Sequence, residues 1–131
     1  MIYLGNKPVG VDYMPCGSFT KHVSMTAAAE SPNSALEFTN PLGVVPKLVV
    51  VKRDTLTTSR VSSVVISTEA NIGGVLYGNS SGVATSTGYG IVSEYTGSYK
   101  TAYLGANMIQ LAKITSSIGY TATDYNVDIY A

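Results

Sequence analysis

The chain of 131 residues has one cysteine, one histidine and no tryptophan. A single cysteine, Cys16, excludes a disulfide within the chain, and beside Met14 and Pro15 we expect it to be a small buried apolar group. One cysteine and one histidine also argue against a zinc site of the ordinary ligand types. A thiol nucleophile formed by Cys16 and His22 has no third group to orient it, so it is not indicated. We therefore expect His22 to lie on the surface or at an interface, and we expect neither a metal nor a cofactor.

Charge is scarce as well. Only 12% of the residues are charged, about half the usual share, and eight basic residues balance eight acidic ones. No stretch is basic enough to attract nucleic acid, so that class of partner is excluded. A glycosidase needs two carboxyl groups across a cleft, and nothing in the sequence singles out such a pair. We expect a protein that is not an enzyme. The acidic residues are scattered over Asp12, Glu30, Glu37, Asp54, Glu69, Glu94, Asp124 and Asp128.

Long apolar runs do not occur. A membrane-spanning helix needs roughly 20 apolar residues, and no run approaches that length. The first ten residues contain the breakers Gly5, Asn6, Lys7 and Pro8, which interrupt any signal-peptide core. We expect a chain made in a cytoplasm, without membrane insertion, and folded as one domain over residues 1–131. Its mean hydropathy of +0.19 favours a subunit whose surface is partly covered by neighbours, including copies of itself.

The clearest structural signal is the segment that leads into residues 48–51. A turn, Asn40-Pro41-Leu42-Gly43, is followed by Pro46 and then by the apolar run Leu48 to Val51. Pro46 lacks an N–H group and therefore suits the entry to a strand. Four consecutive apolar residues, three of them β-branched, predict a central strand that is buried on both faces.

Alternating apolar and polar residues predict further strands. Residues 21–27 place Val23, Met25 and Ala27 on one face, and residues 125–131 alternate in the same way. Residues 107–114 fit both a helix and a strand, and the surrounding strands favour a strand. We expect the pair Gly73-Gly74 to form a bulge or a bend. The sequence thus predicts an all-β fold of about eight to ten strands, an antiparallel β-sandwich that is jelly-roll-like.

Tyrosine is unusually common, with ten residues against two phenylalanines. Five of the tyrosines lie close together and are interleaved with serine, threonine and glycine, a mixture that adaptable recognition surfaces use. Two interpretations stay open and do not exclude each other. These tyrosines form an exposed recognition surface, or they cover a sheet face that packs against a second copy. The candidates are Tyr77, Tyr89, Tyr95, Tyr99 and Tyr103.

Three segments carry a family resemblance. The opening Met1-Ile-Tyr-Leu-Gly-Asn-Lys-Pro-Val-Gly-Val11, the block from Phe38 to Val51 and the closing segment from Tyr125 to Tyr130 resemble strands of small virion structural proteins of tailed bacteriophages. The similar proteins are β-sandwich receptor-binding modules of the tail, baseplate or fibre. The resemblance implies a homo-oligomer, most often a trimer, that is located in the virion, contacts other virion proteins and contributes to host-surface attachment. A host cell-surface glycan is the natural ligand of such a module.

The resemblance also gives residues 1–12 a role, as an N-terminal hairpin or an attachment strand that adds to the sheet edge of a partner. The chain lacks the heptad shaft and the Gly-x-y repeat of a long fibre protein. The alternative is therefore a capsid decoration, cement or head-fibre protein that stabilises the phage head. A small glycan-active enzyme or a free lectin is a further alternative. The apolar residues of the candidate attachment strand are Ile2, Tyr3, Leu4, Val9 and Val11.

Overall fold

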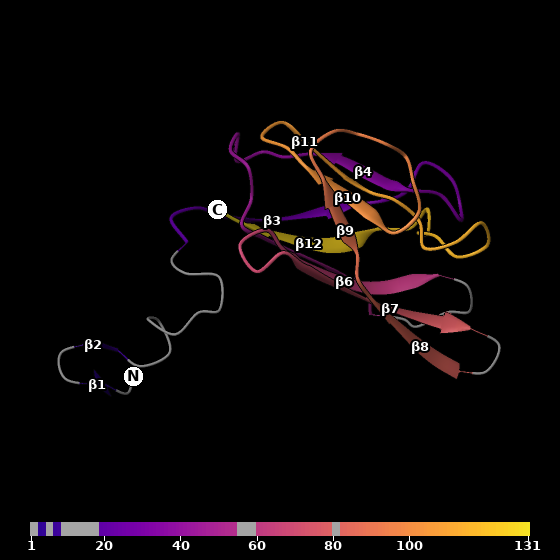
Figure 1. The fold of residues 1–131 in the computed structure, drawn as a ribbon, viewed down its shortest axis with the longest axis horizontal. Coiled ribbons are helices and arrows are strands. Elements are labelled where there is room, and N and C mark those ends of the chain that lie inside the picture. The colour runs from indigo at the N-terminus through magenta and orange to yellow at the C-terminus, as the bar shows by residue number, and fades with distance from the viewer. Residues whose placement is uncertain (1–2, 5–6, 9–18, 55–59, 80–81) are drawn as a thin grey trace.

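The structure is a computed structural model that describes residues 3–4, 7–8, 19–54, 60–79 and 82–131. These residues form twelve strands and no helix, so the predicted all-β class is confirmed. Ten of the strands build two sheets that face each other as a β-sandwich. Figure 1 shows the two layers one above the other. Within the described part of the chain, nothing forms a helix that could cross a membrane.

The larger sheet has six strands, all paired antiparallel. The last strand of the chain, β12, lies between β3 and β5, with Val127 opposite both Met25 and Val51. The C-terminal segment is therefore held on both sides, as its alternation predicts. The spatial order is β3 (His22–Ala27), β12 (Tyr125–Tyr130), β5 (Leu48–Lys52), β6 (Val61–Ser67), β7 (Ile72–Asn79) and β8 (Gly82–Thr87).

The smaller sheet has four strands, in the order β4 (Leu36–Thr39), β11 (Met108–Leu111), β10 (Thr101–Leu104) and β9 (Gly90–Val92). The ambiguous segment 107–114 contains β11, so the choice of a strand is confirmed. Most pairs are antiparallel, but β9 and β10 run parallel. A parallel pair cannot be joined by a tight hairpin, so residues 93–100 return along the sheet before β10 begins.

The core lies between the two sheets and is made of the inward positions of each strand. Because side chains alternate across a strand, one residue in two points into this layer. Leu36 and Phe38 of β4 and Ile109 and Leu111 of β11 face it from the smaller sheet. From the larger sheet come Ala27, Val49, Val51, Val61, Val64, Ile66, Val75, Tyr125, Val127 and Ile129.

The prediction for residues 48–51 is half right. Strand β5 is third of six in its sheet, which is a central position. However, only Val49 and Val51 are fully buried, whereas Leu48 and Val50 are half-buried on the opposite face. A strand is buried on both faces only when both faces are covered, and the described residues cover only the inner face of this sheet.

The predicted bulge at Gly73-Gly74 is wrong. Both glycines pair in register with β6, Gly73 with Ile66 and Gly74 with Val65, and the register shift lies between Val61 and Ser63 instead. Gly73 instead allows Tyr89 to approach the backbone of β7 closely, because a Cβ at position 73 would lie 2.6 Å from the Cβ of Tyr89.

The predicted turn before β5 is confirmed, and Asn40 organises it. The buried side chain of Asn40 donates through Nδ2 to the carbonyl oxygens of Val44 at 2.8 Å and Gly105 at 3.0 Å. Its Oδ1 accepts the N–H of Leu42 at 3.0 Å, and Gly43 takes a left-handed conformation with φ of +71°. The turn is thereby joined to the β10–β11 connection.

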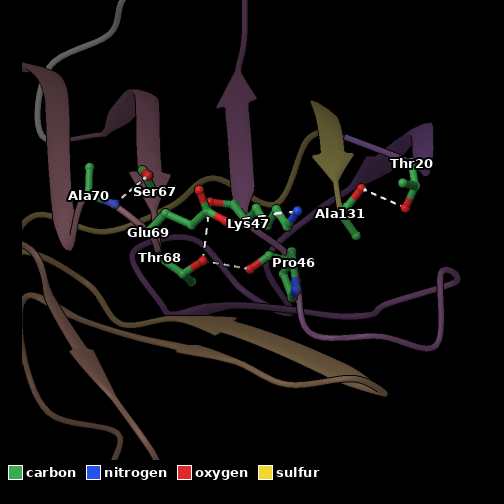
Figure 2. Close-up of polar contacts among 8 residues, drawn as sticks. All are labelled: Thr20, Pro46, Lys47, Ser67, Thr68, Glu69, Ala70 and Ala131. Atoms are coloured by element: carbon green, nitrogen blue, oxygen red, sulfur yellow. Dashed lines mark hydrogen bonds and ion pairs between the residues drawn. The ribbon is translucent and has the colours of Figure 1, made fainter. Parts of the chain in front are cut away.

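Polar contacts also close the end of the larger sheet where β5 begins and β6 ends (Figure 2). The hydroxyl of Thr68 donates to the carbonyl of Pro46 at 2.9 Å, and Lys47 lies 3.8 Å from the carboxylate of Glu69. Ser67 accepts the N–H of Ala70 at 3.1 Å. These contacts tie the entry of β5 to the turn after β6.

The N-terminal strands β1 (Tyr3–Leu4) and β2 (Lys7–Pro8) form a two-stranded antiparallel sheet in which Leu4 pairs with Lys7. The sequence predicts a hairpin over residues 1–12 with its second strand at residues 9–11, whereas the described pairing joins residues 3–4 to residues 7–8. Ile2, Val9, Val11 and Cys16 lie outside the described residues.

Candidate functional site

The outer face of the four-stranded sheet carries a row of polar and aromatic side chains. Leu36, Phe38, Ile109 and Leu111 point into the core, so the residues that alternate with them point outward. The strand register then places one side chain from each strand side by side across the sheet. In order from β9 to β4, this row is Val92, Tyr103, Gln110 and Glu37.

Residues 93–100 carry two exposed tyrosines, and one of them bonds to this face. The hydroxyl of Tyr95 donates a hydrogen bond of 2.5 Å to Oε1 of Glu37. This bond to the Glu37 carboxylate raises the pKa of Tyr95 above its usual value. Because β9 and β4 are the two edges of the sheet, the connection that carries Tyr95 from β9 to Glu37 reaches across the face. Tyr95 nevertheless keeps 51% of its surface exposed.

Tyr99 lies at the end of the same connection and is 53% exposed. The ammonium group of Lys113 sits 5.9 Å from the centre of its ring, which is a cation–π distance. Hydroxyl groups surround the connection: Thr101 donates to the carbonyl of Ser98 at 2.8 Å, and Thr96 accepts the N–H of Ser98 at 3.2 Å. The segment is thus held by its own short-range hydrogen bonds while both rings face solvent.

One residue of the row is unusual. Gln110 is completely buried, yet neither its Oε1 nor its Nε2 has a hydrogen-bond partner among the described residues. Its neighbours across the strands are Tyr103 and Glu37. The ring of Tyr103 is half-buried and leans over Gly105, where a Cβ would lie 2.6 Å from the tyrosine hydroxyl. The surface is called the tyrosine face below, and it comprises Glu37, Tyr95, Tyr99, Tyr103, Gln110 and Lys113.

Three of the five candidate tyrosines, Tyr95, Tyr99 and Tyr103, therefore lie on this sheet and its connection. The other two placements are corrected by the structure. Tyr89 is only 4% exposed and belongs to the core, because the glycine at position 73 leaves room for it. Tyr77 lies on β7 of the other sheet, on the same side as Val75, and packs against the core.

The buried tyrosines form a connected set in the interior. The hydroxyl of Tyr89 donates to the carbonyl of Ala112 and lies 3.2 Å from the hydroxyl of Tyr120. The rings of Tyr120 and Tyr125 meet edge to face with centres 5.6 Å apart. Burial is the main reason why the pKa of each of the three hydroxyls is raised. These phenols stay protonated and serve as hydrogen-bonding groups of the core.

A second polar cluster lies on the outer face of the six-stranded sheet. His22 Nε2 lies 3.0 Å from Oδ1 of Asp128, the hydroxyl of Ser24 donates to the same oxygen at 2.5 Å, and the ring of Tyr130 stacks on His22 at 4.4 Å. The hydrogen bond from Ser24 is the main reason why the pKa of Asp128 is lowered, and the bond from His22 lowers it further. His22 is exposed, as predicted from its position on the polar face of the strand.

This Ser–His–Asp set does not have the geometry of a nucleophilic triad. In a triad the histidine stands between the serine and the acid, and it takes the serine proton on one ring nitrogen while the other nitrogen donates to the acid. Here Ser24 and His22 both bond to one oxygen of Asp128, and the hydroxyl of Ser24 points at the acid. The arrangement instead links β3 to β12.

Sequence reasoning missed three members of the tyrosine face: Glu37, Gln110 and Lys113. The available signal was Gln110, a polar residue inside an otherwise apolar strand. Among the described residues, no three His, Cys, Asp or Glu side chains come close enough to hold a metal ion.

Comparison of the chain with protein-family models, with curated proteins and with solved structures gives no match.

Proposed function

We propose that this chain is a non-catalytic bacteriophage virion subunit that binds a host-surface glycan through the tyrosine face. The observation that carries the proposal is the pair of half-exposed rings, Tyr95 and Tyr99, on the connection between β9 and β10, with the hydroxyl of Tyr95 held on the carboxylate of Glu37. Exposed aromatic side chains next to fixed polar groups are the usual composition of a small-ligand or glycan site.

The chemistry of the face suits a sugar ring. Tyrosine offers a large, rigid and amphipathic surface at low entropic cost, so its ring packs against the C–H face of a pyranose. Glu37 supplies acceptors for sugar hydroxyls, and Thr96 and Thr101 supply further hydroxyl groups nearby. The face carries one carboxylate and one ammonium group, so ligand binding there does not depend on strong attraction to a highly charged polymer.

The assignment to a virion is supported by the resemblance to tail, baseplate and fibre modules. The outer face of the six-stranded sheet adds support for assembly, because it presents apolar side chains. Val65 is 44% exposed there, and Leu48, Val50 and Leu76 are half-buried around it. A trimer that covers these side chains with sister copies accounts for the low charge of the chain.

The same apolar surface favours a second candidate, a capsid decoration or cement protein. In that case Val65 and its neighbours bind the head lattice, and the tyrosine face has no ligand on the host. Imaging of the particle distinguishes the two, because a cement subunit lies on the head, whereas a receptor-binding subunit lies on the tail or baseplate.

Binding of the purified protein to a glycan array tests the proposal. We expect the wild-type protein to bind a subset of glycans and the Tyr99→Ala variant to lose that signal. Tyr130→Ala is the matched control, since Tyr130 lies on the other sheet beside His22. Equal binding by wild type and Tyr99→Ala, or no binding to any glycan, would refute the proposal.

A further inference from the structure

The amide of Gln110 is the polar group that the fold leaves without an explanation. It is fully buried, and both its oxygen and its nitrogen lack hydrogen-bond partners among the described residues. Buried polar groups are nearly always paired, because removing them from water without a partner is unfavourable. An apolar side chain of similar shape at this position would avoid that cost, so the retained amide points to a partner that binds there.

The position of Gln110 shows which residues lie beside it. The amide lies on the outward side of β11, between Tyr103 on β10 and Glu37 on β4. Tyr95 belongs to the connection that follows β9, the edge strand opposite β4, and its hydroxyl bonds to Glu37. Neighbouring strands are about 4.8 Å apart and three such steps separate β9 from β4, so the connection carries Tyr95 over the row that contains Gln110 before its hydroxyl reaches Glu37.

We propose that Tyr95 is a displaceable latch over a binding slot for a neutral pyranose, with Gln110 as the polar floor of that slot. This inference rests on the proposed function, and it names the ligand class and the residues that select it. When the Tyr95 hydroxyl leaves Glu37, the carboxylate and the Gln110 amide become available side by side, with the ring of Tyr103 next to them.

The set of groups defines the ligand class. The Gln110 side chain both donates and accepts, and the neighbouring Glu37 carboxylate only accepts, so together they bind two adjacent hydroxyl groups of one sugar. The ring of Tyr103 offers a stacking surface for the same sugar. Sialic acids and uronic acids are disfavoured, since their carboxylates would lie against Glu37.

Nuclear magnetic resonance reports on the slot directly because Gln110 is the only glutamine of the chain. Protein labelled with ¹⁵N-glutamine gives one side-chain amide pair. We would titrate it with glucose, galactose, mannose and N-acetylglucosamine, each added separately. We expect a saturable shift of the Gln110 amide signals with at least one of these sugars, and none with glucuronic acid.

Two variants test the latch. Tyr95→Phe removes the hydroxyl that holds Glu37 and increases the fraction of open slots, so we expect about three- to tenfold tighter sugar binding. We also expect faster hydrogen exchange of the Gln110 side-chain amide without any sugar. Tyr130→Phe is the control and should leave both quantities unchanged, because Tyr130 lies on the other sheet, where its ring stacks on His22.

The floor is tested by Gln110→Met, which keeps the length of the side chain and removes the amide. We expect an unchanged or higher melting temperature together with about tenfold or greater loss of sugar affinity. Binding on the glycan array with an unmoved Gln110 signal would overturn the slot and leave the proposed function standing. Absence of all glycan binding would overturn both, and Gln110→Met with wild-type affinity would overturn the slot alone.

Discussion

The Cβ of Tyr89 occupies the space that a side chain at Gly73 would need. A Cβ at position 73 would lie 2.6 Å from that of Tyr89 and 3.4 Å from Ile66 Cγ1. Gly73 belongs to β7 of the six-stranded sheet, and Tyr89 lies in the connection that leads from β8 of that sheet to β9 of the other. The contact therefore fixes how the chain passes from one layer to the other, and it places β9 at the edge of the sheet that bears the tyrosine face.

Gly73→Ala should destabilise the fold by about 1–3 kcal/mol, because inserting a methyl group into a packed site forces side chains or backbone to shift. Chemical denaturation measures the loss. Gly74→Ala is the matched control, since nothing lies within 4 Å of a Cβ at that position, and its stability should equal the wild-type value or slightly exceed it. Equal losses for the two variants would contradict the account of Gly73.

Removal of the hydroxyl of Tyr125 should also weaken the core. This hydroxyl donates to the carbonyl of Val61 at 2.6 Å and accepts the N–H of Thr121 at 3.1 Å. Tyr125→Phe leaves the buried carbonyl of Val61 without that donor, so we expect a loss of about 1–3 kcal/mol in thermal or chemical unfolding. Tyr99→Phe changes an exposed ring and should stay within about 0.5 kcal/mol of wild type.

The turn before β5 depends on one amide. Asn40→Ala removes the three hydrogen bonds to Val44, Gly105 and Leu42, and it leaves the buried carbonyl of Gly105 without this donor. We expect about 1–3 kcal/mol of destabilisation, measured by urea unfolding. Asn126→Ala, on the exposed side of β12, is the control and should change stability little. A neutral result for Asn40→Ala would show that the turn is held by other contacts.

Alkaline pH should unfold the protein through its buried phenols. The pKa values of Tyr89, Tyr120 and Tyr125 are raised above 10.0 in the folded state, mainly by burial. An unfolded chain releases these protons near pH 10, so the folded state binds more protons above that pH. The stabilising effect is complete below pH 10 and is lost as the pH rises toward the folded-state values.

Ultraviolet titration of tyrosinate at 295 nm checks this linkage. We expect Tyr89, Tyr120 and Tyr125 to ionise together with the loss of the folded far-ultraviolet spectrum. The result would contradict the account if all ten tyrosines ionised near pH 10 in a protein that remains folded.

Much of the fold was predictable because it follows from alternation. The outward and inward positions of residues 22–27 and 125–130 are correct, and so is the strand at 108–111. Alternation is a local property and is readable from one sequence. The burial of both faces of residues 48–51 was predicted wrongly, because coverage of the outer face depends on what lies above the sheet, which no local pattern reports.

The site was predictable only in part, because its members come together through contacts that no local pattern reports. The tyrosine-rich stretch indicated a recognition surface, but it could not separate the exposed Tyr95 and Tyr99 from the buried Tyr89. That difference arises from Gly73, which is distant in sequence and whose local pattern predicts only a bulge or a bend. Glu37 joins the face only through the pairing of β4 with β11, a long-range contact.

Recognition through the tyrosine face is tested by following the tyrosine ring signals in nuclear magnetic resonance spectra while an oligosaccharide that binds on the array is added. The account predicts shifts for Tyr95, Tyr99 and Tyr103, with the rings of Tyr120 and Tyr125 unmoved. Shifts confined to Tyr130 and the outer face of the six-stranded sheet, with Tyr95, Tyr99 and Tyr103 unchanged at saturation, would contradict it.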